Sequence, residues 1–174
     1  MGKLLTLAQA KKVRAALKAS KKTVVFTNGV FDLLHKGHES ILKKSKKLGN
    51  ALFVGLNSDA SVKRIKGPSR PIFGEKIRAR MLCSLPSVNY VVIFNERTPL
   101  RLLSSLKPDI HVKGGDWKGK ALPERKLVES WGGKVRIVDS GKSISTTELI
   151  AKMKNPVGSR RPALERFRAQ EGGK

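Results

Sequence analysis

Two histidines three residues apart, His35 and His38, are the side chains in this sequence best placed to do chemistry. They flank Gly37 and follow an apolar run, residues 24–26, that breaks at residues 27–29. Residues three apart lie on one face of a helix, so both imidazoles would sit beside main-chain N–H groups that lack intrahelical partners. Such a helix start attracts phosphate, and Gly37 lets a ligand approach the backbone. The alternative is that the histidines only cap the helix.

Strand-like and helix-like segments alternate along the chain. Apolar runs predict strands at residues 24–26, 51–57, 90–94, 109–113 and 134–138, and helical spacing predicts helices at residues 7–19, 35–48, 61–66, 75–85, 99–106, 123–131 and 145–154. Parallel strands need crossover connections, so this alternation predicts an α/β fold with a five-stranded parallel sheet and helices on both faces. Ligands of such sheets bind beyond the carboxyl ends of the strands, where the polar and glycine-rich segments fall.

The 174 residues suit one domain with flanking segments. Residues 1–22 are expected to form an amphipathic helix, residues 23–154 the domain, and residues 155–174 a flexible basic tail. The first residues lack the apolar core of a signal peptide, and no run is long enough to span a membrane. Cys83 is the only cysteine, which suits a reducing cytoplasm. We therefore expect a cytoplasmic protein.

The net charge of +24 is spread through the chain, since only five of the 37 basic residues lie in residues 155–174. A nucleic-acid-binding surface is one interpretation, because positively charged side chains bind the phosphate backbone of nucleic acids. However, only 5% of residues are aromatic, and no recognised nucleic-acid-binding motif is present. We favour a solvated surface that gathers anionic substrates, with no specific nucleic-acid partner.

The string T-N-G-V-F-D-L-L-H-K-G-H, residues 27–38, resembles the opening motif of the nucleotidyltransferase superfamily that includes the cytidylyltransferases. Within this superfamily the chain is most similar to the D-glycero-β-D-manno-heptose 1-phosphate adenylyltransferases of lipopolysaccharide precursor synthesis. Residues 144–147, I-S-T-T, match the second superfamily motif. The resemblance covers about residues 23–154 and implies a Rossmann-like nucleotidyltransferase fold and a homodimer.

Three segments bear on which nucleotide is used. Cytidylyltransferases have arginine where Ser140 stands, and heptose adenylyltransferases lack it, which favours ATP. The glycine usual before the second motif is Ser143 here. Residues 113–116, K-G-G-D, also resemble the heptose group, whereas residues 117–120, W-K-G-K, resemble the W-E-G-K of glycerol 3-phosphate cytidylyltransferases.

The resemblance implies roles for individual residues. The catalytic residues would be His35, His38, Lys66 and Arg78, with Lys63 second to Lys66 as the triphosphate lysine and Arg80 as an alternative to Arg78. The nucleotide would be bound by Thr27, Asn28, Gly29, Phe31, Gly37, Asn57, Lys63, Gly114, Gly115, Asp116, Ser145, Thr146 and Thr147. No protein residue is assigned to metal, because Mg²⁺ would be held by the phosphates of ATP.

The chemistry implied is transfer of AMP from ATP to a sugar 1-phosphate. The sugar phosphate is already anionic near neutral pH, so no general base is needed. The protein must overcome repulsion between two polyanions, which requires position and positive charge. Transfer of CMP from CTP to glycerol 3-phosphate, or to a related polyol phosphate, is the alternative within the class. A basic RNA- or anion-binding protein is the alternative outside it.

Overall fold

The apolar run after Lys22 forms the strand at the centre of the sheet. In the computed structural model, which describes residues 1–139, β2 (Val24–Gly29) lies between β3 (Ala51–Asn57) and β5 (Ile110–Gly114). Every residue of β3 is buried, as in a parallel strand covered on both faces. The strands β1 (Lys3–Leu5), β4 (Tyr90–Phe94) and β6 (Lys134–Val138) complete an all-parallel sheet. Its order is β1-β4-β3-β2-β5-β6.

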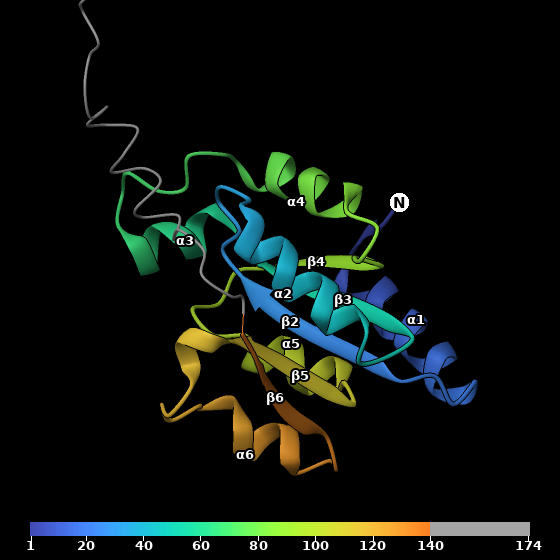
Figure 1. Ribbon diagram of the computed structural model, residues 1–174. Coiled ribbons are helices and arrows are strands. Elements are labelled where there is room, and N and C mark those ends of the chain that lie inside the picture. The colour runs from blue at the N-terminus through green and yellow to red at the C-terminus, as the bar shows by residue number, and fades with distance from the viewer. Residues whose placement is uncertain (140–174) are drawn as a thin grey trace, which may run out of the picture. The chain divides into compact units, whose positions relative to one another are not determined.

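Helices cover both faces of this sheet, as the sequence predicted. The helices are α1 (Leu7–Ala19), α2 (Lys36–Lys46), α3 (Asp59–Lys66), α4 (Glu75–Ser84), α5 (Leu100–Leu106) and α6 (Glu124–Glu129), with a 3₁₀ turn, η1 (Gly115–Trp117). Figure 1 shows α2 in front of the sheet and α5 behind it. No helix within residues 1–139 is long and apolar enough to cross a membrane.

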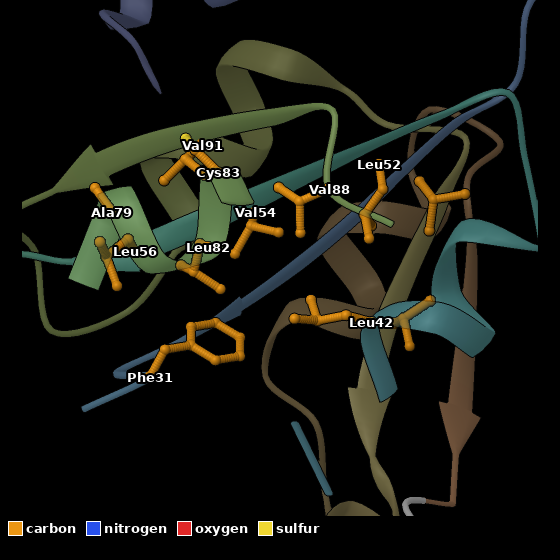
Figure 2. Packing of buried hydrophobic residues seen from close by; sticks show 12 residues of the cluster. Phe31, Leu42, Leu52, Val54, Leu56, Ala79, Leu82, Cys83, Val88 and Val91 are labelled. Atoms are coloured by element: carbon orange, nitrogen blue, oxygen red, sulfur yellow. The ribbon is translucent and has the colours of Figure 1, made fainter. Parts of the chain in front are cut away.

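Two hydrophobic clusters fill the space between the sheet and the helices on its two faces. On one face, Leu42 of α2 and Leu82 of α4 pack with Leu52, Val54 and other strand residues, and Figure 2 shows this cluster from close by. On the other face, side chains of α1, α5 and α6 pack on alternate residues of the same strands: Ala10, Leu102, Leu103, Leu106 and Val128 on Val24, Phe26, Ala51 and Phe53. Because successive strand residues point to opposite faces, β2 and β3 each contribute to both clusters.

The number of strands differs from the predicted fold, since the sheet within residues 1–139 has six strands and not five. The sixth, β1, pairs in parallel with β4, with Lys3 opposite Tyr90 and Leu5 opposite Val92. Three residues are too few to show an alternating pattern, so the sequence offered no signal for this strand. The helix predicted next to it was right: α1 runs from Leu7 to Ala19 behind a capping box between Thr6 and Gln9.

The strand order changes direction between β2 and β5. From β2 the chain moves outward through β3 to β4, and it then crosses back to place β5 and β6 on the opposite side of β2. In parallel sheets, the crevice at such a switch point, beyond the carboxyl ends of the strands, is where ligands bind. The carboxyl end of β2 carries Asn28 and Gly29, and the carboxyl end of β5 carries Lys113 and Gly114. The fold therefore brings two of the predicted motifs to one crevice.

The core of the sheet contains a fully buried histidine, His111 of β5, whose ring centroid lies 5.6 Å from that of Phe26. Burial, and to a lesser extent the charge of Lys113, lowers the pKa of His111 to about 3, although the main chain of Phe26 opposes this shift. An unfolded chain binds the proton at about pH 6.5. Between these values the unfolded state binds more protons, so stability is greatest above about pH 6.5 and falls as the pH is lowered toward 3.

We therefore expect His111→Leu to flatten the pH dependence of stability. The free energy of unfolding of the unmodified chain should fall by up to about 1.4 kcal/mol per pH unit for this group alone below about pH 6. The variant should lose that part of the slope and keep the part due to other histidines. Urea denaturation at a series of pH values measures the difference. Equal slopes in the two chains would contradict the prediction.

Candidate active site

The two histidines of the predicted motif face each other at the amino end of α2. His35 is the N-cap residue, and its Nδ1 accepts a hydrogen bond from the main-chain N–H of Gly37 at 3.2 Å. Because Nδ1 is the acceptor, the proton of the neutral ring sits on Nε2. The rings of His35 and His38 stack, with centroids 3.8 Å apart. Capping and a phosphate site were alternatives in the sequence, and the structure shows that His35 does cap the helix.

Both histidines are less basic than usual. The pKa of His38 is lowered to about 4, first by burial and then by the neighbouring His35, while the main chain of Leu33 opposes the shift. Burial also lowers the pKa of His35. Near pH 7 the pair is therefore uncharged in this ligand-free state, and it offers N–H donors rather than two cations. A bound polyanion would raise both pKa values, because a nearby negative charge favours the protonated ring.

Phe31 packs against His38, and Gly29 packs against the Phe31 ring. Phe31 has a φ of +46° and is buried, and its ring meets that of His38 edge-on with centroids 5.1 Å apart. A Cβ atom at Gly29 would lie 3.0 Å from the Phe31 ring. A side chain at Gly29 would therefore press on the Phe31 ring. The sequence predicted contact between both residues and the nucleotide, and the structure gives Phe31 a packing contact with the histidine.

Asp32 ties the histidine loop to the segment after α3. Its Oδ1 accepts hydrogen bonds from the main-chain N–H groups of Ile72 at 2.8 Å and Phe73 at 3.1 Å. Its Oδ2 lies 2.8 Å from Nε of Arg70, and the carboxylate is only 1% exposed. The sequence around Asp32 does not indicate this role, because its partners lie about forty positions away along the chain. Nothing in the local pattern identifies them.

Arg78 lies at the junction of three segments. It is fully buried, and its Nη1 donates to the carbonyls of Val30 at 2.7 Å and Asn57 at 2.8 Å. Its Nε donates to the carbonyl of Phe73 at 2.8 Å, and its Nη2 pairs with Asp59 at 2.6 Å. These bonds hold the ends of β2 and β3 and the loop before α4 together. The catalytic role predicted for Arg78 stays a prediction, and the contacts it makes here are with the protein.

The predicted triphosphate lysines lie on α3. Lys63 and Lys66 are exposed in its last turn, and neither has an ion pair within residues 1–139. The helix ends at Gly67, whose φ of +96° suits glycine. The predicted alternative to Arg78, Arg80, is also exposed.

Two other predicted nucleotide ligands use their side chains inside the protein. The Thr27 hydroxyl donates to the carbonyl of Val112 at 3.0 Å, across the β2–β5 pair. The side-chain amide of Asn57 donates to the Ser61 hydroxyl at 3.0 Å. Both residues are 4% exposed. Their side chains thus bond to the protein at the strand ends, and their contact with a nucleotide stays a prediction.

The glycine-rich end of β5 is closely packed. A Cβ atom at Gly114 would lie 2.7 Å from Oδ1 of Asp116 and 3.2 Å from Cδ1 of Ile41 on α2. The aspartate therefore folds over the position where a side chain would stand. Since Ile41 belongs to the helix that begins with the histidines, this contact links α2 to the glycine loop. A Cβ atom at Gly115 would meet Asp139 at 3.4 Å.

Lys113 joins the two sides of the switch point. Its Nζ donates to Oδ1 of Asn28 at 3.0 Å and lies 3.0 Å from Oε1 of Glu124, the first residue of α6. It also lies 5.0 Å from the centroid of the Trp117 ring. Both charged side chains are nearly buried, at 7% and 6% exposure. Glu124 had no role in the sequence analysis, because the pairing depends on how α6 packs.

The structure thus places the ends of β2, β3 and β5 and the start of α2 at one edge of the sheet. Ser145, Thr146 and Thr147, with the helix predicted from them and the tail, lie outside the described residues. Within residues 1–139, no three His, Cys, Asp or Glu side chains are grouped as ligands for a metal ion.

A depression lies at the opposite, amino end of β2, away from the candidate site. It is lined by Arg14, Lys18, Lys21, Lys22, Thr23 and Asp109.

Comparisons with known proteins agree with the geometry. The cytidylyltransferase-like family model matches residues 26–156. The bifunctional protein HldE of Syntrophotalea carbinolica is 52% identical over 132 residues, which are 76% of this chain and 27% of that protein. The HldE of Pelobacter propionicus is 51% identical over 138 residues, 79% of this chain and 28% of that protein. The chain therefore spans less than a third of the length of these curated relatives.

Solved structures share the fold. The lipopolysaccharide core biosynthesis protein from Thermoplasma volcanium is 34% identical, with a TM-score of 0.59 over 71% of this chain and 99% of that chain. A pantoate–β-alanine ligase from Francisella tularensis, with 12% identity and a TM-score of 0.55, shows likeness of fold alone. The Rossmann-like nucleotidyltransferase fold predicted from the sequence is confirmed. Since the family model matches most of its length, the chain belongs to the cytidylyltransferase-like family.

Proposed function

We propose that this chain transfers AMP from ATP to D-glycero-β-D-manno-heptose 1-phosphate, giving ADP-heptose and pyrophosphate. The observation that carries the proposal is the stacked pair of His35 and His38 at the amino end of α2, beside the crevice between β2 and β5. The HldE relatives and the lipopolysaccharide core biosynthesis protein support a sugar phosphate as the acceptor. The homodimer and the cytoplasmic location remain predictions.

The reaction is a displacement at the α-phosphorus of ATP. An oxygen of the sugar phosphate attacks, a new P–O bond forms, and the bond to the β-phosphate oxygen breaks as pyrophosphate leaves with the electron pair. No proton has to be removed from the nucleophile, since a phosphate monoester has its second pKa at about 6. The protein supplies alignment and stabilises the negative charge on the phosphate oxygens in the transition state.

Each group of residues has a place in this step. We assign the N–H donors of His35 and His38 to the reacting phosphates, together with the start of α2. Lys66, with Lys63, would reach the β- and γ-phosphates from α3. Ser145, Thr146 and Thr147 would bind the same phosphates from the second motif. Gly114, Gly115 and Asp116 would hold the ribose or base.

Mg²⁺ is the cofactor of this proposal. It typically binds through substrate phosphates and one or two carboxylates, so a cage of protein ligands is not required. When bound, it neutralises part of the triphosphate charge and makes pyrophosphate a better leaving group.

Asp32 and Arg78 bond to groups of the protein itself. We propose that they hold the loops of the site in position.

The first test is His38→Ala. If His38 stabilises the transition state, kcat should fall by about 10² or more, by analogy with loss of an oxyanion donor, while the fold remains. His38→Gln should recover part of the loss, because its amide keeps a hydrogen-bond donor. Lys47→Ala, at the exposed far end of the same helix, is the matched control and should leave kcat unchanged. Near-normal turnover by a well-folded His38→Ala chain would remove the basis of the site.

The second test identifies the nucleotide and the acceptor. ATP, CTP, GTP and UTP are each paired with heptose 1-phosphate, other hexose 1-phosphates and glycerol 3-phosphate, and pyrophosphate release is followed with and without Mg²⁺. We expect the highest kcat/KM for ATP with heptose 1-phosphate, because polar groups matched to one substrate are left unpaired by another. Removal of Mg²⁺ should abolish release. If CTP with glycerol 3-phosphate were the best pair, the W-K-G-K segment would have been the better guide.

A further inference from the structure

Lys113 makes contacts with three separate elements of the protein, β2, α6 and η1. It lies in β5, next to Asn28 of β2, and Glu124 approaches it from the start of α6. The Trp117 ring covers the ammonium group from η1. With its side chain 7% exposed, Lys113 has little surface left for a triphosphate. A lysine beside a glycine-rich loop would ordinarily be assigned to phosphate, and these contacts indicate another role.

The contact with Lys113 determines how the Asn28 amide is turned. An ammonium group has only donors, so the atom of Asn28 that faces it at 3.0 Å must be the carbonyl oxygen, Oδ1. The Nδ2 donors then point away from Lys113. Asn28 is only partly buried and stands at the carboxyl end of β2, at the switch point of the sheet. The amide therefore offers two donors at the place where parallel sheets bind nucleotides.

The ion pair of Lys113 and Glu124 is expected to add little to the free energy of unfolding. Two charges have been removed from water, and an apolar pair of similar volume often stabilises a protein as well or better. One oxygen of Glu124, Oε2, is buried and accepts no hydrogen bond from the described residues. An unsatisfied buried acceptor reduces what the pair contributes to stability. By contrast, Arg125 and Glu129 on the outer face of α6 form an exposed pair.

We infer that Lys113 and Glu124 are a positioning pair for Asn28. Glu124 holds the ammonium group of Lys113 in the protein interior, and Lys113 turns the Asn28 amide so that Nδ2 donates to an acceptor atom of the nucleotide. The inference rests on the proposed function for the identity of the nucleotide. It assigns Lys113 no contact with phosphate.

The test is a mutant cycle on ATP binding. The chains are the unmodified protein, Asn28→Ala, the double variant Lys113→Met/Glu124→Leu, and the variant that combines all three substitutions. We expect Asn28→Ala and the double variant each to weaken ATP binding about tenfold, and the combined variant to weaken it no further, because both changes remove the same hydrogen bond. Calorimetric titration with ATP gives the dissociation constants.

Stability and kinetics separate positioning from a structural role. The double variant should unfold at the same or a higher urea concentration than the unmodified chain, and its KM for ATP should rise more than its kcat falls. Glu124→Gln, which keeps an acceptor for Lys113, should have a smaller effect on KM. Arg125→Met/Glu129→Leu, a pair on the exposed face of the same helix, is the matched control and should alter neither binding nor kinetics.

The inference would be overturned by losses that multiply in the combined variant to about a hundredfold, or by a double variant that is less stable than the unmodified chain. Failure of the proposed function has a different signature. If the unmodified chain binds ATP and releases no pyrophosphate with any sugar phosphate, the proposed function fails, while the binding cycle still decides how Asn28 is positioned. A chain that binds no nucleotide would overturn both.

Discussion

Arg78 donates four hydrogen bonds from a fully buried position, and its acceptors belong to separate segments that shape the crevice. Carbonyl groups at the ends of parallel strands have no partner in the sheet, and burying them unpaired would cost about 1–3 kcal/mol each. The guanidinium satisfies those of Val30 and Asn57 and takes Asp59 as its counter-charge. A planar group with five donors is suited to this, and lysine could not replace it. The loop with the histidines and the loop before α4 are thereby held to the same strand ends.

Charge is used in two ways in this protein. Inside, Asp32 with Arg70 and Lys113 with Glu124 are pairs with little solvent contact, and each connects a strand end to a loop or helix elsewhere in the chain. Such pairs contribute little net stability after desolvation, but their geometry is specific. Outside, exposed lysines and arginines give most of the net charge of +24. They would attract polyanionic substrates over a range of about 8–10 Å at physiological salt.

The histidine pair is partly buried, and its rings are uncharged near pH 7. Stacked rings and partial burial keep His35 and His38 neutral near pH 7, which avoids placing two like charges 3.8 Å apart at ring centroids before a substrate arrives. The pair can gain charge when a phosphate binds, because a nearby negative charge favours the protonated ring. Without the anion, the partial positive charge of the helix start disfavours protonation. The site therefore need not store the repulsion of two cations in its ligand-free state.

Local patterns in the sequence determined the elements and the position of the site along the chain. Amphipathic helical spacing placed α1 at Leu7–Ala19, and the three-residue spacing of His35 and His38 put both rings on one face, because these depend on neighbours within a few positions. Only the tertiary structure decided that β1 joins the sheet, that Arg78 is buried, and that Asp32 and Lys113 meet Arg70 and Glu124. Each of these depends on how separate segments of the chain pack together. The residues next to them in the sequence do not indicate which side chain will be the partner.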